Sequence, residues 1–184
     1  MSDISMNRIA CLRTGTIFAL ALIFLAGCAS TPSDDSLIRE SRATLERFVD
    51  RDPGLQGWID HAHAYAVFPE IAKGGLGVGG GFGRGIVFEQ GRPIGRTTTS
   101  QATIGAQIGA QSYSQVIFFQ DESALRVFQR ENLEFSAQAT AVAASAGAAA
   151  TTSYERGVAV FIMTRGGLMA EVSIGGQKFR YSAL

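Results

Sequence analysis

Glycine at alternate positions is the feature that most restricts how this chain can fold. Between residues 75 and 85 glycine occupies every odd position, while the even positions read Leu, Val, Gly, Phe and Arg. Side chains of a β-strand alternate between two faces, so the pattern predicts a strand over 73–88 with one bare face and one mostly apolar face. Six glycines on one face weaken a strand unless another backbone or a ligand lies close to them. The sequence therefore predicts a packing partner against the bare face.

Helices are expected before this strand and further strands after it. Apolar residues recur at helical spacing over 37–49 and 55–62, and Pro53-Gly54 separates the two runs. A turn is expected over 90–93, and Asp121 is expected to cap a helix that runs to 132. The remaining strands are expected over 64–68 (closed by Pro69), 98–113, 116–119 (on its own or as the end of the preceding strand), 135–150, 157–163, 168–174 and 177–181.

Two features of this pattern bear on the fold class. The alanine content of 135–150 favours helix, but its alternation of polar residues with alanine favours a strand of small residues. Two Gly-Gly pairs, at 166–167 and 175–176, are typical of hairpin turns between the last strands. The order of elements indicates an α+β fold, with N-terminal helices packed on a glycine-rich, mostly antiparallel β-sheet or partly closed barrel.

The first 27 residues have the pattern of a secretory signal. Arg8 and Arg13 precede an apolar run over 17–25 that is too short to span a membrane as a helix. The sequence Leu-Ala-Gly-Cys at 25–28 then resembles the lipobox of bacterial lipoproteins, in which Cys28 becomes the lipidated first residue, carrying acyl chains such as palmitate. The alternative is an unmodified Cys28 at the end of a signal peptide. Ala29 follows the cysteine and, by resemblance to Gram-negative sorting rules, favours an outer-membrane anchor that faces the periplasm.

These features predict a signal peptide over 1–27, a lipidated tether over 28–36 and one domain over 37–184. Either Met1 or Met6 can be the start. The leader removes two arginines and one aspartate, so the rest of the chain has one acidic residue in excess. General nucleic-acid binding needs a basic footprint and is not expected. Cys11 leaves with the leader, so neither disulfides nor cysteine metal sites are expected in the domain.

The motifs predict no catalytic residue, no cofactor and no metal site. Residues 75–80 satisfy G-x-G-x-x-G, but a dinucleotide site needs a helix that begins within those glycines, and the strand pattern continues instead. His61 and His63 are two residues apart and would point about 200° apart on a helix, so they could share a metal ion only on a strand with a third ligand such as Glu70. The strained G-x-S-x-G elbow of many hydrolases is missing. A non-enzymatic protein is expected.

Three motifs, in order along the chain, resemble the SYLF domain family: HAYAVFPEIAKGGLGVGGGFGRGIVF over 63–88, TIGAQIGAQ over 103–111 and TRGGLMAEVSIGG over 164–176. The resemblance extends over 36–184. It implies a non-enzymatic, lipid-binding domain, because eukaryotic relatives bind acidic phospholipids and some bind actin. This chain has only two lysines, Lys73 and Lys178, which argues against strong phosphoinositide affinity.

The candidate lipid site combines cations with the bare strand: Lys73, Arg84 and Arg165 with Gly75, Gly77, Gly79 and Gly81. The cations would hold a phosphate while the bare strand accepts an acyl chain; alternatively they are ordinary surface charges. Arg84 interrupts a series expected to face inward, so it would need an anionic partner such as Glu89, Glu70 or a lipid phosphate. The predicted function is an outer-membrane-anchored lipoprotein with a non-catalytic phospholipid-binding domain. The alternative is an envelope structural or protein-interaction module without a lipid ligand.

Overall fold

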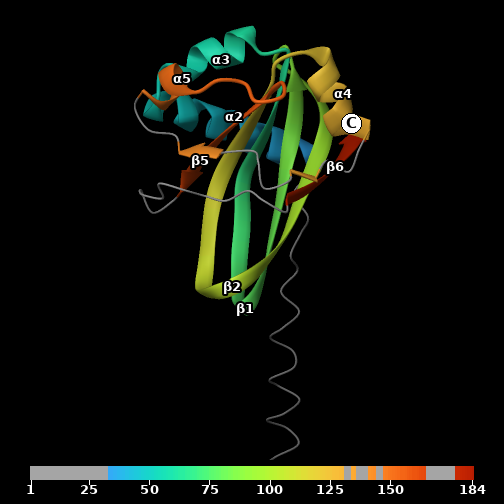
Figure 1. Ribbon diagram of the computed structural model, residues 1–184. Helices are drawn as coiled ribbons and strands as arrows, with labels where there is room; N and C mark the ends of the chain where they lie inside the picture. The colour runs from blue at the N-terminus through green and yellow to red at the C-terminus, as the bar shows by residue number, and fades with distance from the viewer. Residues whose placement is uncertain (1–32, 131–133, 136–140, 144–146, 165–176) are drawn as a thin grey trace, which may run out of the picture. The chain divides into compact units, whose positions relative to one another are not determined.

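The structure is a computed structural model that describes residues 33–130, 134–135, 141–143, 147–164 and 177–184. All described elements lie within one compact unit, Ser33–Leu184. In chain order they are α2 (Asp34–Arg51), α3 (Leu55–His61), β1 (Ala64–Glu89), β2 (Arg92–Phe119), α4 (Glu122–Arg130), β3 (Glu134–Phe135), β4 (Ala141–Ala143), α5 (Ala148–Thr151), β5 (Val158–Thr164) and β6 (Gln177–Ala183). The expected α+β class is confirmed (Figure 1). No helix in this part of the chain has the length and apolar character needed to cross a membrane.

The predicted helices form, and local capping explains where they begin and end. The Ser33 side chain accepts a hydrogen bond from the Ser36 backbone N–H at the start of α2, where acidic residues also suit the helix dipole. α2 ends at Arg51, directly before the predicted break at Pro53-Gly54. At α4, the Asp121 carboxylate accepts from the Ala124 backbone N–H over 2.9 Å, as its predicted capping role requires.

The two longest strands, β1 and β2, pair with each other along their whole length as one antiparallel ribbon. Gln90 and Gly91 join them with φ of +48° and +78°, the left-handed geometry of a tight hairpin turn. The predicted strands over 98–113 and 116–119 are thus one strand, which begins at Arg92.

Pro69 does not end the strand as predicted. Instead, β1 continues through a bulge in which residues 69 and 70 lie opposite the single residue Ser114. Proline cannot donate to the ladder, so a bulge is one of the few places where a strand tolerates it. The Ser114 hydroxyl donates to the Pro69 carbonyl oxygen over 2.7 Å, which satisfies that buried acceptor.

The ribbon is folded back on itself, and Figure 1 shows both strands turning together at the end labelled β1 and β2. At the bend the register shifts, because one residue of β1 lies opposite three of β2 between the pairs Leu76–Ile108 and Val78–Ile104. Extra residues in one strand bend a ladder and increase its twist. We call residues 64–74 with 110–119 the first arm, and residues 79–89 with 92–102 the second arm.

The other edge of β2 carries two separate strands. β6 pairs with residues 95–101 of the second arm, and β5 pairs with residues 113–119 of the first arm. β3 and β4 extend the sheet outward from β6 and β5, and β4–β5 is the one parallel pair among the described strands. The described sheet is mostly antiparallel, as predicted, and it is not closed into a barrel.

The prediction of one strand over 135–150 is wrong at its end, where Ala148–Thr151 forms the short helix α5, in agreement with the helical propensity of alanine. The predicted strand over 168–174 and the two Gly-Gly turns lie outside the described residues. The strands predicted over 157–163 and 177–181 are confirmed as β5 and β6.

Two hydrophobic clusters cover opposite faces of the sheet. One lies against α2, α3 and α5, and its largest side chains are Phe48, Phe88, Phe118 and Phe161. The other lies against α4 and β6, and it contains Phe68, Phe119, Phe128 and Phe179. The helices therefore hold the ribbon from both sides at the end opposite its bend (Figure 1).

Candidate functional site

The bare glycine face of the second arm packs against the first arm. A Cβ atom at Gly83 would lie 2.6 Å from Ile71 Cγ1 and 2.9 Å from the Glu70 carbonyl oxygen, and one at Gly85 would overlap the Val67 carbonyl oxygen. These distances are below van der Waals contact, so only glycine lets the two arms approach this closely. The packing partner that the sequence predicted is thus the beginning of the same strand.

Lys73 lies between the two arms. Its Cγ would be 3.1 Å from a Cβ at Gly81, and its ammonium lies 4.8 Å from the centroid of the Tyr113 ring. Burial lowers the pKa of Lys73 and raises the pKa of Tyr113. The Tyr113 hydroxyl accepts a hydrogen bond from Gln177 Nε2 over 2.8 Å, so a buried polar network lies beside the Lys73 side chain.

Arg84 points in the opposite direction, so its predicted inward orientation is wrong. Because glycines 81, 83 and 85 lie on the inner face, the alternating residues Phe82 and Arg84 point outward. Ile86, the next residue on the outward face, is buried in the cluster against the helices. Within the described residues the Arg84 side chain makes neither a hydrogen bond nor an ion pair, and only its backbone is paired, with Thr98. Glu89 was predicted as a partner of Arg84, but its Oε1 atom instead lies 2.9 Å from His63 Nε2.

The candidate residues are therefore separated. Lys73 and Arg84 lie on opposite faces of the second arm, while Cys28 and Arg165 lie outside the described residues. Gly81 faces the Ala72 carbonyl oxygen and the Lys73 stem, and Gly79 is partly exposed. Gly75 is described only by its backbone pairing with Gly109, and Gly77 only as the residue of β1 at the register shift.

Arg84 belongs to a different cluster, because strand pairing brings other cations beside it. One cross-strand row is Arg84–Thr98–Arg180, and the neighbouring row is Phe82–Ser100–Lys178. Directly paired residues share a face of the sheet, and β6 alternates buried Gln177 and Phe179 with exposed Lys178 and Arg180. Phe82 is 55% exposed.

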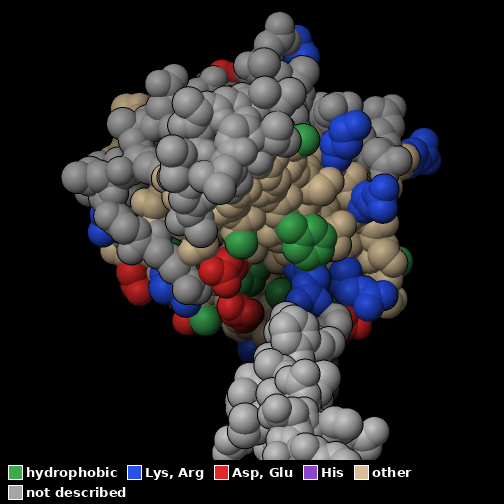
Figure 2. All heavy atoms as spheres, turned by 90° about the horizontal axis from the view of Figure 1, so that it is seen from below, with side chains coloured by type: hydrophobic (Ala, Val, Ile, Leu, Met, Phe, Trp, Pro, Cys, Tyr) green, Lys and Arg blue, Asp and Glu red, His purple; other side chains and the backbone are tan. Residues whose placement is uncertain are grey.

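Arg96 extends this surface towards α2, where its guanidinium lies 3.3 Å from the Asp34 carboxylate. We call Phe82, Arg84, Arg96, Lys178 and Arg180 the basic face. Figure 2, which looks at the molecule from below relative to Figure 1, shows Lys and Arg side chains gathered beside an exposed hydrophobic side chain. The basic face thus combines several cations with an aromatic ring in water.

Residues 100–182 match the model of the Ysc84 family, described as Las17-binding protein actin regulator. This is the SYLF family that the sequence motifs resemble, and the match covers a little under half of the chain. The resemblance found in the sequence motifs is thereby confirmed, and the matched segment runs from the second arm of β2 into β6. The basic face joins Lys178 and Arg180, which lie inside the matched segment, to Phe82 and Arg84, which precede it.

A curated relative is similar to a larger part of the chain. It is Beta cell expansion factor A of Aeromonas veronii, 29% identical over 138 residues that cover 73% of this chain and 52% of the relative. The chain thus spans about half the length of the curated relative that it matches.

The two histidines of the chain have separate surroundings. His61 ends α3, where its Nδ1 lies 2.7 Å from the Gly57 carbonyl oxygen. His63 Nε2 is close to the Glu89 carboxylate, but it does not meet the direction of a hydrogen bond. Among the described residues, no three metal-ligating side chains come together.

Sequence reasoning missed Phe82 and Arg180 as surface partners of Arg84. The alternation of buried and exposed residues in β6 was readable over 177–181, so the outward direction of Arg180 could have been found. The pairing of β6 with residues 95–101 could not, because it joins segments about eighty residues apart with no local signal.

Proposed function

We propose that the chain is a lipoprotein of the bacterial outer membrane, anchored through Cys28 and facing the periplasm, whose SYLF-family domain binds phospholipid without catalysis. The observation that carries the proposal is the basic face, where exposed Phe82 shares a surface with Arg84 on β1 and with Lys178 and Arg180 on β6, across β2. The lipobox resemblance supports the anchor, and the family supports a lipid-binding domain.

The basic face has the composition of an interfacial binding surface. A Lys or Arg near an anionic membrane surface contributes about 1 kcal/mol. Burying a phenylalanine side chain in the acyl boundary adds roughly 1.5–3 kcal/mol. The whole chain has no net formal charge. The attraction is therefore local to the basic face, and the domain would meet the membrane in one orientation.

The proposed anchor and the basic face are compatible with one membrane. Cys28 precedes Ser33, the cap of α2, by five residues, a reach of at most about 18 Å for extended chain. Asp34, the next residue, contacts Arg96 of the basic face. A lipid on Cys28 would tether the domain to one membrane, which raises the effective concentration of the basic face there.

The test is co-sedimentation of residues 33–184, which contain both core clusters, with vesicles of phosphatidylglycerol and phosphatidylcholine. The variant Arg84→Ala/Arg180→Ala removes two cations of the basic face. We expect it to lose about 2 kcal/mol of binding, or about 30-fold, at low salt, and less at high salt. The matched control, Arg126→Ala/Arg130→Ala, removes two exposed charges from α4.

Equal weakening by the control pair would show that total charge, not the basic face, governs binding. Failure of the unaltered domain to bind any anionic vesicle would overturn the lipid-binding proposal. The anchor is tested separately by mass spectrometry of the membrane-extracted chain, in which Cys28 should carry acyl groups and Cys28→Ser should release the protein from the membrane.

A second candidate function is an envelope protein-interaction module. The observation that favours it is the outer edge of β1, which pairs with no strand other than β2 in the described part of the sheet. Unpaired strand edges are common sites for strand addition by a partner. Crosslinking in cells that captures one defined protein through β1, without retained lipid, would favour this function.

A further inference from the structure

A second surface, remote in the sequence from most of the basic face, surrounds Trp58. It is an open pocket of about 600 Å³ between α3, the end of β2 and the segment after α5. This volume is within the range of about 300–1,000 Å³ that is typical of small-molecule sites. The pocket shares no residue with the basic face.

Two aromatic rings form the apolar part of this pocket. Trp58 and Tyr154 have ring centroids 4.8 Å apart, and both are partly exposed. Trp58 is held from behind, because its ring also contacts Phe118 and Phe161 and its Nε1–H donates to the Ala149 carbonyl oxygen over 3.2 Å. The aromatic surface is therefore rigid before any ligand arrives.

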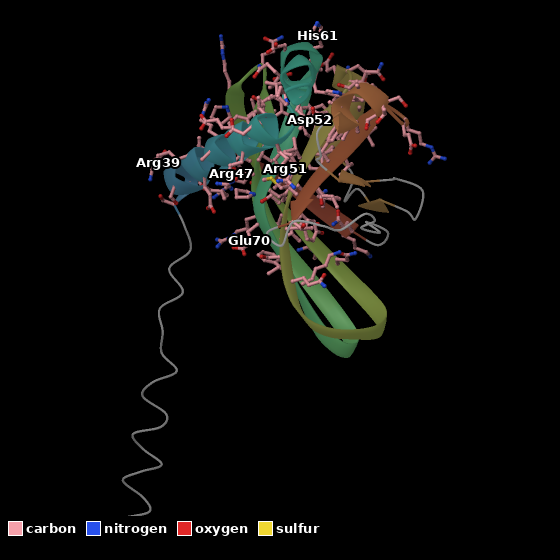
Figure 3. All side chains as sticks on the ribbon, turned by 90° about the vertical axis from the view of Figure 1, so that its left-hand side faces the viewer. Arg39, Arg47, Arg51, Asp52, His61 and Glu70 are labelled. Atoms are coloured by element: carbon pink, nitrogen blue, oxygen red, sulfur yellow. The ribbon has the colours of Figure 1, made fainter. Side chains whose placement is uncertain are left out.

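The polar groups around these rings are uncharged donors and acceptors with spare capacity. Gln120 and Ser153 are exposed, and neither side chain has a hydrogen-bond partner in the described structure. The His61 Nδ1 contact with the Gly57 carbonyl oxygen requires a proton on Nδ1, so in the neutral ring Nε2 is an acceptor. Figure 3 shows His61 at the outer end of α3. No Lys, Arg, Asp or Glu is among the described residues that line the pocket.

We propose that this pocket binds a neutral carbohydrate. A pyranose ring has apolar C–H faces that suit an aromatic surface, and its equatorial hydroxyls suit amide, hydroxyl and imidazole groups at the edge. A charged ligand would find no Lys, Arg, Asp or Glu as a countercharge among the described residues of the lining. This site gives the chain a second binding activity besides membrane binding. Through it the domain attaches to a glycan in the compartment where the domain lies.

Gly57 offers a way to block the pocket without disturbing the fold. It lies on the pocket side of α3, and a Cβ there would meet no heavy atom within 4 Å. Glycine is also the weakest helix former apart from proline, so a larger residue at this position stabilises the helix. Gly57→Gln therefore fills the pocket mouth, while Gly57→Ala gives the helix stabilisation with little added volume.

The experiment uses tryptophan fluorescence of the full chain, because Trp58 is its one tryptophan. The chain is purified in a detergent without a sugar headgroup and titrated with maltose, cellobiose and N,N′-diacetylchitobiose. We expect a saturable change with at least one of them, with a dissociation constant on the order of 1 mM for so open a site. Gly57→Gln should abolish the change, and Gly57→Ala should keep it.

Two further variants test the polar groups. Gln120→Ala and Ser153→Ala should each weaken binding by about fivefold to tenfold, through loss of one hydrogen bond, without a change in melting temperature. Mannitol, an open-chain polyol, should produce no saturable change. The proposal is overturned if none of the three disaccharides gives a saturable response, if mannitol gives the same response, or if Gly57→Gln binds as the unaltered chain does. Vesicle binding depends on other residues, so either proposal can fail alone.

Discussion

The Gly83→Ala substitution tests the contact between the two arms of the ribbon. The new methyl carbon would lie 2.6 Å from Ile71 Cγ1, 2.9 Å from the Glu70 carbonyl oxygen and 3.2 Å from Thr99 Cγ2. Carbon atoms attract each other best at about 3.5–4.0 Å, so the closest of these contacts is too short by about 1 Å. The Glu70 carbonyl belongs to the bulged backbone of a paired strand and cannot rotate away as a flexible side chain would.

These distances give an expected loss of about 2 kcal/mol. Overpacking of this kind costs typically 1–3 kcal/mol, and contact with backbone puts Gly83→Ala near the top of that range. Alanine would otherwise gain about 0.5–1 kcal/mol, because the unfolded chain has less freedom to lose. For a domain of this size the melting temperature should fall by about 4–8 °C.

The assay is urea unfolding followed by circular dichroism, with thermal melting as a second measurement. The matched control is Gly80→Ala in the same strand, where the new Cβ would meet only the Gln101 carbonyl oxygen, at an ordinary 3.6 Å. We expect the control to be neutral or slightly stabilised. If Gly83→Ala is as stable as Gly80→Ala, the arms do not pack against each other at this glycine and the account of the folded ribbon is wrong.

Two further predictions concern buried polar groups. Burial lowers the pKa of Lys73, so the unfolded chain binds the proton of the Lys73 ammonium more tightly than the folded chain does. The free energy of unfolding should therefore rise with pH between the lowered pKa and about 10.4. Lys73→Met should remove this rise when urea midpoints are measured at a series of pH values. The Asp52 carboxylate accepts hydrogen bonds from the backbone N–H of Gly54 at 3.1 Å and of Ala149 at 2.8 Å. Asp52→Ala should lose about 2–3 kcal/mol, and hydrogen exchange should become faster in α5, whereas unchanged exchange there would show that Asp52, labelled in Figure 3, does not hold the helix.

Much of the fold was readable from the sequence because its signals are local. The Asp121 cap, the break at Pro53 and the turn near Gly91 each act within a few residues, and each was predicted in place. Pro69 shows the limit of such signals. Proline does interrupt the ladder, but the choice between ending a strand and bulging depends on whether a partner such as Ser114 lies across the sheet.

The candidate site was less predictable, because it depends on which face of a strand turns inward. The alternation of glycine with Phe82 and Arg84 predicts a packing partner against the bare face, and the structure shows one, but the face with Arg84 was expected to turn inward as well. Burial usually follows apolar side chains, whereas here close backbone contact with residues 67–72 places the glycines inside. The cross-strand rows that add Lys178 and Arg180 depend on a register set by distant residues.

The folding of the ribbon and the exposure of the basic face have one physical origin. Side chains alternate strictly along a strand, so once Gly81, Gly83 and Gly85 must face the first arm, Phe82 and Arg84 can only face outward. Further along, Ile86 has the same outward direction but is covered by the helical layer, which explains why the strand returns to apolar residues there. The glycine pattern that restricts the fold most is therefore also what places an aromatic ring and a guanidinium on the surface of the second arm.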